Sequence, residues 1–178
     1  MLPEPGVIME CDSDEKTVWG NAGARAGSFA MDLLDDYEPD LKLAAARDVC
    51  VLIAAEPELA LKVAQDIANR DRRKRTQIRV LDCDAMDAFA VRRALSESLL
   101  EPAQPGTACG TLLLREVHAL NAQNQSMLAD LLAIAQPAEA PRVIASSSTS
   151  LFDRVRMGQF DDRLFYRLNT IYMAFNRA

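Results

Sequence analysis

Two charged residues, Arg115 and Glu116, directly follow the apolar run 111–114. A short continuous apolar run of this kind predicts a strand that is buried on both faces of a parallel sheet. In open α/β sheets, ligands bind just outside the carboxyl ends of the strands. We therefore expect any ligand chemistry of this domain to involve Arg115 and Glu116.

Other reactive side chains lack the partners that their chemistry needs. His118 is the single histidine, and no second metal ligand or nucleophile stands beside it in the sequence, so we expect no catalytic role for it. The polar run 146–150 lacks the elbow of a catalytic serine and favours a loop that caps the following helix. The cysteines are far apart and form no CxxC pair, which predicts reduced packing residues rather than disulfides or zinc ligands; they are Cys11, Cys50, Cys83 and Cys109.

Apolar runs and helical periodicity alternate along the chain. Strands that alternate with helices indicate a three-layer α/β fold, with a parallel five-stranded sheet covered by helices on both faces. One or two short helices broken by Pro39 are expected before the first strand. The predicted strands are 49–54, 78–81, 110–114, 142–145 and 170–175, and the predicted helices are 59–69, 87–100, 121–135, 151–156 and 161–167.

The formal charge of −6 is concentrated in the first part of the chain. Residues 1–48 carry eleven acidic and four basic side chains, whereas the rest is nearly neutral. We divide the chain into an acidic N-terminal arm, residues 1–28, which lacks a sustained apolar period, and one domain, residues 29–178. An acidic protein without a basic stripe is not expected to bind DNA directly. No apolar run reaches the roughly 18 residues of a membrane span and no signal-peptide pattern is present, so we expect a cytoplasmic protein without membrane contact.

The segment after the first predicted strand does not have the composition of a phosphate-binding loop. Such a loop needs glycines, whose N–H groups approach the phosphates, together with a lysine and a hydroxyl group for Mg²⁺. Here glycine is absent, Pro57 removes one N–H donor, and the nearest lysine, Lys62, is displaced along the helix. We therefore expect no nucleotide cofactor and no metal ion. The degenerate segment comprises Ala54, Ala55, Glu56, Pro57, Glu58, Leu59, Ala60 and Leu61.

Four segments resemble a known family, the AAA+ ATPase domain of bacterial enhancer-binding activators of sigma-54 RNA polymerase. That family typically contains VLITGESGTGKELVARAIH, VNC, GTLFLDEI, RVIAATNRDL and GRFREDLYYRLN. The most specific match is residues 158–169, GQFDDRLFYRLN, which keeps the glycine, the phenylalanine and the whole YRLN ending. The resemblance implies a P-loop NTPase/AAA+ α/β subdomain, here expected to lack the helical lid and the helix-turn-helix module. The similar segments are residues 49–68, 80–83, 110–132 and 142–175.

The departures from the family pattern concern its nucleotide site. The aspartate that orders Mg²⁺ in the family corresponds to Arg115, whereas the glutamate that polarises the attacking water is kept as Glu116. A cation facing Mg²⁺ reverses the sign of an interaction worth about 4 kcal/mol at ~4 Å in an effective dielectric of ~20. The family's sensing asparagine corresponds to Ser148, one candidate arginine finger to Asp161, and the other is retained as Arg167. The GAFTGA loop that contacts the sigma factor is also absent. The resemblance thus implies a pseudo-ATPase in which Glu116 and Arg167 are vestigial.

Structural roles compete with these family roles. Glu116 can serve as a strand-end acceptor that pairs with Arg115 or with a helix N-terminus. Arg167 and Asn169 can be kept for local hydrogen bonds or for a contact between subunits.

Two functional hypotheses follow. The first is a non-hydrolysing AAA+-like regulatory protein that acts through protein contacts in sigma-54-linked transcription, with an AAA+ sigma-54 activator or a second copy of itself as partner. The alternative is a diverged nucleotide-binding protein or residual ATPase, in which the Arg115 guanidinium would contact phosphate directly. A decayed gene fragment without a selected role is a third possibility. The candidate interaction residues are Phe160, Asp161, Arg163, Tyr166 and Arg167.

Overall fold

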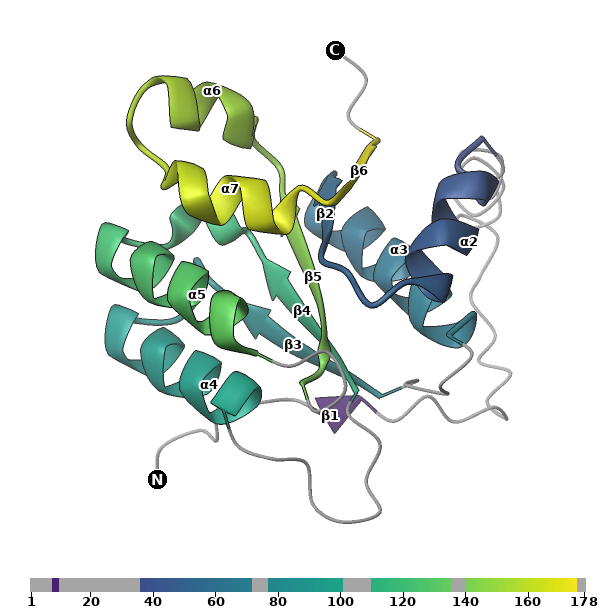
Figure 1. Cartoon of the computed structure of the whole chain (residues 1–178), viewed down its shortest axis with the longest axis horizontal. Helices are drawn as coiled ribbons and strands as arrows, with labels where there is room; N and C mark the ends of the chain where they lie inside the picture. The colour runs from purple at the N-terminus through teal and green to yellow at the C-terminus, as the bar shows by residue number, and fades with distance from the viewer. Residues whose placement is uncertain (1–7, 10–35, 72–76, 101–109, 136–139, 176–178) are drawn as a thin grey trace, which may run out of the picture.

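The computed structural model describes residues 8–9, 36–71, 77–100, 110–135 and 140–175, which form a central sheet between two groups of helices (Figure 1). The strands are β1 (Ile8–Met9), β2 (Val51–Ala54), β3 (Ile78–Asp82), β4 (Thr111–Arg115), β5 (Arg142–Ser147) and β6 (Ile171–Ala174). The helices are α2 (Glu38–Ala46), α3 (Pro57–Asn69), α4 (Ala88–Leu100), α5 (Ala122–Ile134), α6 (Leu151–Arg156) and α7 (Asp162–Leu168), with a 3₁₀ turn, η1 (Val117–Ala119), after β4.

Five strands of the sheet run parallel in the order β3-β4-β5-β2-β6. This arrangement confirms the predicted five-stranded parallel sheet. The short strand β1 adds an antiparallel edge, with Ile8 opposite Arg79 of β3. It was not predicted, because two residues are too few to give a period. The strand order brings the carboxyl ends of β2, β3, β4 and β5 to one edge of the sheet.

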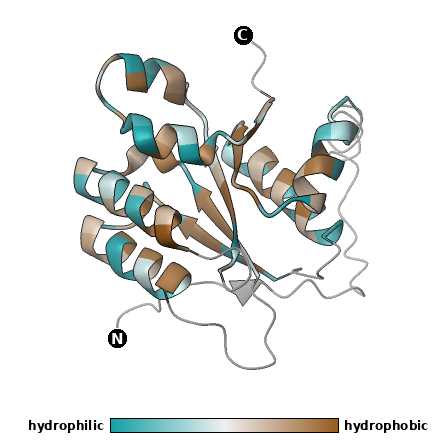
Figure 2. Cartoon of the chain, in the orientation of Figure 1, coloured by the Kyte–Doolittle hydropathy of each residue, from teal (hydrophilic) through white to brown (hydrophobic). Residues whose placement is uncertain are grey.

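Each face of the sheet has its own hydrophobic core. Helices α4, α5 and α7 cover the face that contains Leu112 and Leu114, whereas α2 and α3 cover the face that contains Leu113 and Ile144. Side chains of successive strand residues point to opposite faces, which explains this alternation. Figure 2 shows the central strands in the brown of hydrophobic residues. Within the described ranges, no helix is both long and apolar enough to span a lipid bilayer.

Local sequence signals explain where the helices begin. Pro57 occupies the first turn of α3, where its missing N–H is not needed. Three later helices begin after a side chain that accepts a hydrogen bond from a backbone N–H of the first turn. This bond satisfies one of the N–H groups that a helix start leaves without a partner. The residues that cap α5, α6 and α7 in this way are Asn121, Ser150 and Asp161.

Three features near the element ends differ from the predictions. Pro39 lies in the first turn of α2 and does not break a helix, since the first turn tolerates proline. Strand β5 extends through Ser146 and Ser147, which are fully buried, so the predicted polar loop is shorter than expected. Ile134, an apolar residue of the predicted helix 121–135, is 65% exposed at the end of α5. The predicted helical segment before residue 36 lies outside the described residues, as does most of the acidic arm.

A buried ion pair closes the amino end of the sheet. The Arg142 Nη2 atom lies 3.3 Å from Asp71 Oδ2, and both side chains are almost inaccessible to solvent. The same nitrogen donates to the carbonyl oxygens of Ala45 and Arg47 at 3.0 and 3.4 Å. Arg142 therefore connects the start of β5 to the ends of α2 and α3.

Candidate functional site at the carboxyl edge of the sheet

The carboxyl end of β4 places Glu116 inside the protein. Its side chain is 5% exposed, and its backbone is left-handed, with φ 51° and ψ 48°. This conformation is unfavourable for a residue with a side chain and costs on the order of 1–3 kcal/mol. Such strain persists only where the surrounding contacts hold it. Glu116 is therefore the residue of this edge whose local conformation most needs an explanation.

The loop after β5 supplies the contacts of Glu116. The backbone N–H of Ser148 donates to Glu116 Oε1 at 3.2 Å, and the Ser148 hydroxyl donates to Oε2 at 2.7 Å. Ser148 is the residue that the sequence resemblance matches to the family's sensing asparagine. Two donors from one residue satisfy a carboxylate without a neighbouring cation. Glu116 thus ties the end of β4 to the segment that leads into α6.

His118 joins the same cluster from η1. Its Nδ1 atom lies 3.1 Å from Glu116 Oε2 and 3.1 Å from the hydroxyl oxygen of Ser147. Burial lowers the pKa of His118 below its ordinary value of 6.5, and the charge of Glu116 partly opposes this shift. A carboxylate and a serine hydroxyl therefore do lie beside His118, although nothing near it in the sequence indicated Ser147, which is 29 residues away.

The cluster does not have the geometry of a catalytic triad. Glu116 and Ser147 both approach Nδ1 of His118, whereas a triad places the acid and the nucleophile on different ring nitrogens. In addition, the Ser147 hydroxyl donates to the carbonyl of Thr149 at 2.7 Å and is buried. We therefore interpret the cluster as a buried hydrogen-bond network that fixes the carboxyl edge.

Arg115 does not pair with Glu116, so the first of the two structural alternatives for Glu116 was wrong. Its Nη1 atom forms an ion pair with Asp82 Oδ2 of the neighbouring strand β3, at 3.3 Å. Residues 82 and 115 lie opposite each other in the parallel register. Burial, followed by a hydrogen bond with the Asp84 carboxylate, raises the pKa of Asp82, while the charge of Arg115 opposes this rise. Glu116 lies just beyond the end of β4 with a left-handed backbone, and its carboxylate contacts Ser148 of the loop after β5 instead of Arg115.

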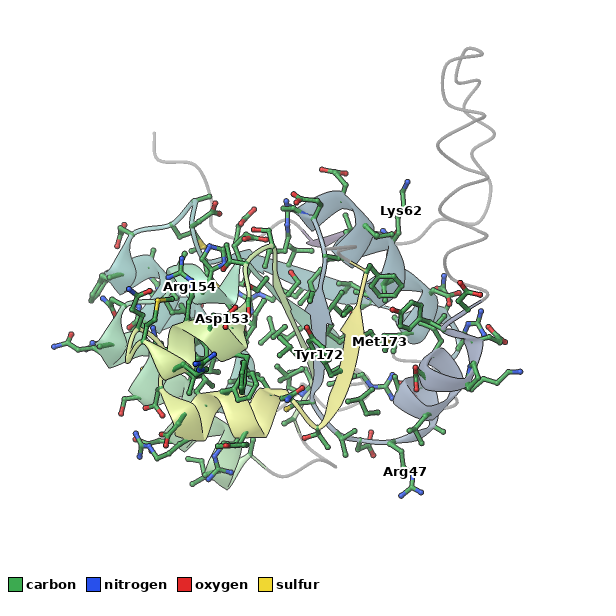
Figure 3. The ribbon with its side chains drawn as sticks, turned by 90° about the horizontal axis from the view of Figure 1, so that it is seen from above. Arg47, Lys62, Asp153, Arg154, Tyr172 and Met173 are labelled. Atoms are coloured by element: carbon green, nitrogen blue, oxygen red, sulfur yellow. The ribbon has the colours of Figure 1, made fainter. Side chains whose placement is uncertain are left out.

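The connection between β2 and α3 is short. Only Ala55 and Glu56 separate the two elements, and Pro57 already belongs to the helix. The N–H of Ala55 donates to the Ser147 carbonyl at 3.2 Å, and that of Ala60 donates to the Glu56 carbonyl at 2.9 Å. Ala55 and Ala60 are fully buried. The side chain of Lys62 is exposed and points away from the sheet (Figure 3).

The other predicted interaction residues lie on α7 and just before it. Asp161 accepts from the N–H groups of Arg163 and Leu164 as the cap of α7, and the Arg163 guanidinium, 3.0 Å away, lowers the pKa of this carboxyl. Tyr166 is 73% exposed and Arg167 is also exposed. Phe160, in contrast, is 4% exposed and packs in the core, so it supports the surface from below instead of contacting a partner.

The two retained family positions lie apart within this chain. Burial raises the pKa of the Cys50 thiol to about 11, and the charge of Arg167 partly opposes that rise, which places Arg167 near the amino end of β2. Glu116 lies at the carboxyl end of β4. In the parts of the chain that the structure describes, no three histidine, cysteine or acidic side chains are grouped closely enough to hold a metal ion.

The parallel sheet, its strand order and its helices define an α/β fold of the P-loop NTPase class, AAA+ type, and no helical lid follows β6 within the residues described. The chain belongs to the sigma-54 interaction domain family, whose model matches residues 33–175. This confirms the resemblance that the motifs indicated. Family membership supports a role in sigma-54-linked regulation.

Solved structures with the same fold have low sequence identity to this chain. NtrX from Brucella abortus in complex with ATP has a TM-score of 0.64 at 17% identity over 81% of this chain and 35% of its own. The P-loop NTPase domain of a sigma-54 transport activator from E. coli has a TM-score of 0.59 at 19% identity, over 80% of this chain and 94% of that domain. The RuvB Holliday junction branch migration motor of Thermotoga maritima has a TM-score of 0.56 at 17% identity, over 82% and 45% of the two chains.

This chain therefore spans about a third of the length of NtrX and most of an isolated activator domain. No curated protein matches its sequence.

Proposed function

We propose that this protein is a non-hydrolysing AAA+-like regulator that acts in the cytoplasm through protein contacts in sigma-54-linked transcription. The main support is the connection between β2 and α3. It has two residues, no glycine and no lysine, and the N–H group of Ala55 already donates to the Ser147 carbonyl. A phosphate-binding loop needs such N–H groups free to face the phosphates.

The strand end supports the same proposal. Arg115 occupies the position of the family's Mg²⁺-ordering aspartate and pairs with Asp82. An Mg²⁺ ion there would meet a cation and would have to displace that pair. Ser148 donates hydrogen bonds to both carboxylate oxygens of Glu116. These oxygens would otherwise be the acceptors for a water molecule.

Exposed residues of α7 support a role in protein contact. Tyr166 and Arg167 are exposed next to each other, and aromatic residues and arginine are the types enriched at the centres of protein interfaces. The proposed partner is the AAA+ domain of an active sigma-54 activator, with a second copy of this chain as the other arrangement. Direct DNA contact is not part of the proposal.

Calorimetry with ATP and ADP, with and without Mg²⁺, tests the first part of the proposal. We expect no heat of binding at millimolar nucleotide. An activator AAA+ domain titrated under the same conditions is the positive control. Binding in the micromolar range would overturn the proposal in favour of the alternative, a diverged nucleotide-binding protein or residual ATPase, which the buried Glu116 and the retained Arg167 support.

Mixing the protein with an activator AAA+ domain tests the second part. We expect a complex in light scattering after gel filtration and a changed ATPase rate of the activator. Tyr166→Ala and Arg167→Ala should weaken the complex, each by about tenfold or more. Phe89→Ala is the matched control, because Phe89 is 74% exposed on α4 and lies outside α7. Equal loss in the control, or no complex and no change in rate, contradicts the proposal.

A further inference from the structure

A second feature near the carboxyl edge is a cavity of about 210 Å³ on the α6 and α7 side of the sheet. Its floor includes Leu52 and Ile53 of β2, which are 2% and 0% exposed. Leu151 and Phe165 contribute apolar walls from α6 and α7. An apolar cavity of about 150 Å³ is large enough to bind benzene. The cavity therefore has room for a molecule of one or two aromatic rings.

Aromatic side chains flank the opening of the cavity. Phe152 of α6 is 58% exposed and Tyr172 of β6 is 54% exposed, and both line the cavity. Figure 3 shows Tyr172 on the side of β6 that faces α6, where Asp153 and Arg154 are labelled, with Met173 on the other side. Phe165 lies behind them, its ring centroid 6.4 Å from that of Phe152. The two rings are tilted by 51°, at a separation typical of packed aromatic pairs.

The polar groups of the lining are neutral. None of the residues that line the cavity carries a charge, and its polar members are Ser147, Thr149, Asn169 and Tyr172. The Ser147 hydroxyl donates to the Thr149 carbonyl, and the Thr149 hydroxyl accepts from Arg154 Nε at 3.2 Å. The Arg154 guanidinium is already hydrogen-bonded to the Thr149 hydroxyl and does not line the cavity, so a charged ligand would lose its hydration without finding a counter-charge among the lining residues. The lining thus favours a neutral occupant.

One acceptor of the lining lacks a hydrogen bond. The side-chain oxygen of Asn169, at the end of α7, is buried and has no hydrogen-bond partner among the described residues. A buried carbonyl oxygen without a donor is unfavourable, and each such group in a native structure needs an explanation. Because this oxygen has almost no accessible surface, the Asn169 amide would have to rotate toward the cavity for a ligand N–H or O–H group to supply the missing donor.

We propose that this cavity binds a small neutral aromatic molecule that donates a hydrogen bond to Asn169. The ligand class is one or two fused rings with a single N–H or O–H group, as in indole or phenol. Phe152, Phe165 and Tyr172 hold the ring, and Asn169 selects for the donor. This site goes beyond the proposed function, because binding of the aromatic molecule neither requires nor excludes a nucleotide or a protein partner.

Titration of the full chain with indole and with indene, followed by two-dimensional amide NMR, tests the proposal. Indene has nearly the same shape as indole but lacks the N–H group. We expect saturable shifts centred on Ser147, Asn169 and Tyr172, with indole binding about fivefold more tightly than indene. Asn169→Leu should remove the preference for indole while leaving indene binding in place. Equal affinity for both probes in the unchanged protein overturns the role of Asn169.

Two further variants keep the location of the site testable. Ala54→Leu adds side-chain volume to the lining and should abolish binding of both probes, with an amide spectrum that remains dispersed. If that variant does not fold, Tyr172→Ala removes an exposed ring at the opening and should weaken both probes several-fold. Phe89→Ala removes a still more exposed ring, on α4, and should change neither affinity. No saturable shift with either probe, or shifts centred on Phe89, overturns the site.

Discussion

The two ends of the parallel sheet hold their buried charges in opposite ways. At the amino end, Arg142 lies 3.3 Å from the carboxylate of Asp71, so two opposite charges form a buried ion pair. At the carboxyl end, Glu116 has the hydroxyl and N–H of Ser148 as donors, so its charge is stabilised chiefly by neutral groups. The first arrangement joins helices to the sheet. The second holds Glu116 in a strained backbone conformation. Because such strained residues cluster at functional sites, Glu116 is the residue to test at this edge.

The largest effect is expected at the amino end. Arg142→Met leaves Asp71 buried without its cation and should lower the free energy of unfolding by about 3–5 kcal/mol in urea denaturation. Combining it with Asp71→Leu should recover much of the loss, because no unpaired charge then remains. Arg163→Met, in an exposed ion pair with Asp161, is the control and should change stability little. If Arg142→Met lowered the free energy of unfolding only slightly, the buried ion pair would not distinguish the amino end of the sheet from the carboxyl end.

A pair of substitutions at Glu116 measures the strain at the carboxyl end. Glu116→Ala leaves the donors of Ser148 without an acceptor and should cost about 1–3 kcal/mol in urea denaturation. Glu116→Gly loses the same hydrogen bonds but relieves the left-handed conformation, so it should be more stable than Glu116→Ala by about 1 kcal/mol. If alanine is the more stable of the two, the backbone at this position stores no strain.

The dependence of stability on pH also distinguishes the carboxyl end of the sheet, where His118 lies, from the amino end. Because burial lowers the pKa of His118 in the folded state, the unfolded chain binds more protons below pH 6.5. The contribution of neutral His118 to the free energy of unfolding is fully present above pH 6.5. It is lost as the pH falls from 6.5 through the lower pKa of His118 in the folded protein. His118→Gln should therefore flatten the fall in melting temperature between pH 7.5 and about 5. An unchanged slope in this variant would show that His118 does not titrate with folding.

The smallest effect is expected from removal of residues 1–28. The described contact of this segment is the two-residue pairing of β1 with β3 at the edge of the sheet. Truncation should lower the melting temperature by less than about 4 °C, the shift that roughly 1 kcal/mol produces in a domain of this size. A much larger fall would show that the segment belongs to the folded domain and is not a separate acidic arm.

Most of the fold could be predicted from the sequence because its signals are local. The apolar runs indicated the five parallel strands, and helical periodicity located α3 to within two residues of its observed start at Pro57. The segment GQFDDRLFYRLN indicated the family that residues 33–175 match. These features depend on neighbours within one element, so a single sequence contains the information for them.

The partners of the charged and reactive residues were decided by the tertiary structure alone. Asp82 and not Glu116 pairs with Arg115, Ser147 lies beside His118, and Phe160 is buried under α7 instead of facing a partner. Each of these contacts joins elements that the strand order β3-β4-β5-β2-β6 brings together from distant parts of the chain. The sequence by itself determined the elements and the family, because periodicity and motifs are local. The three-dimensional packing decided which side chains meet, since that depends on the order of the strands in space.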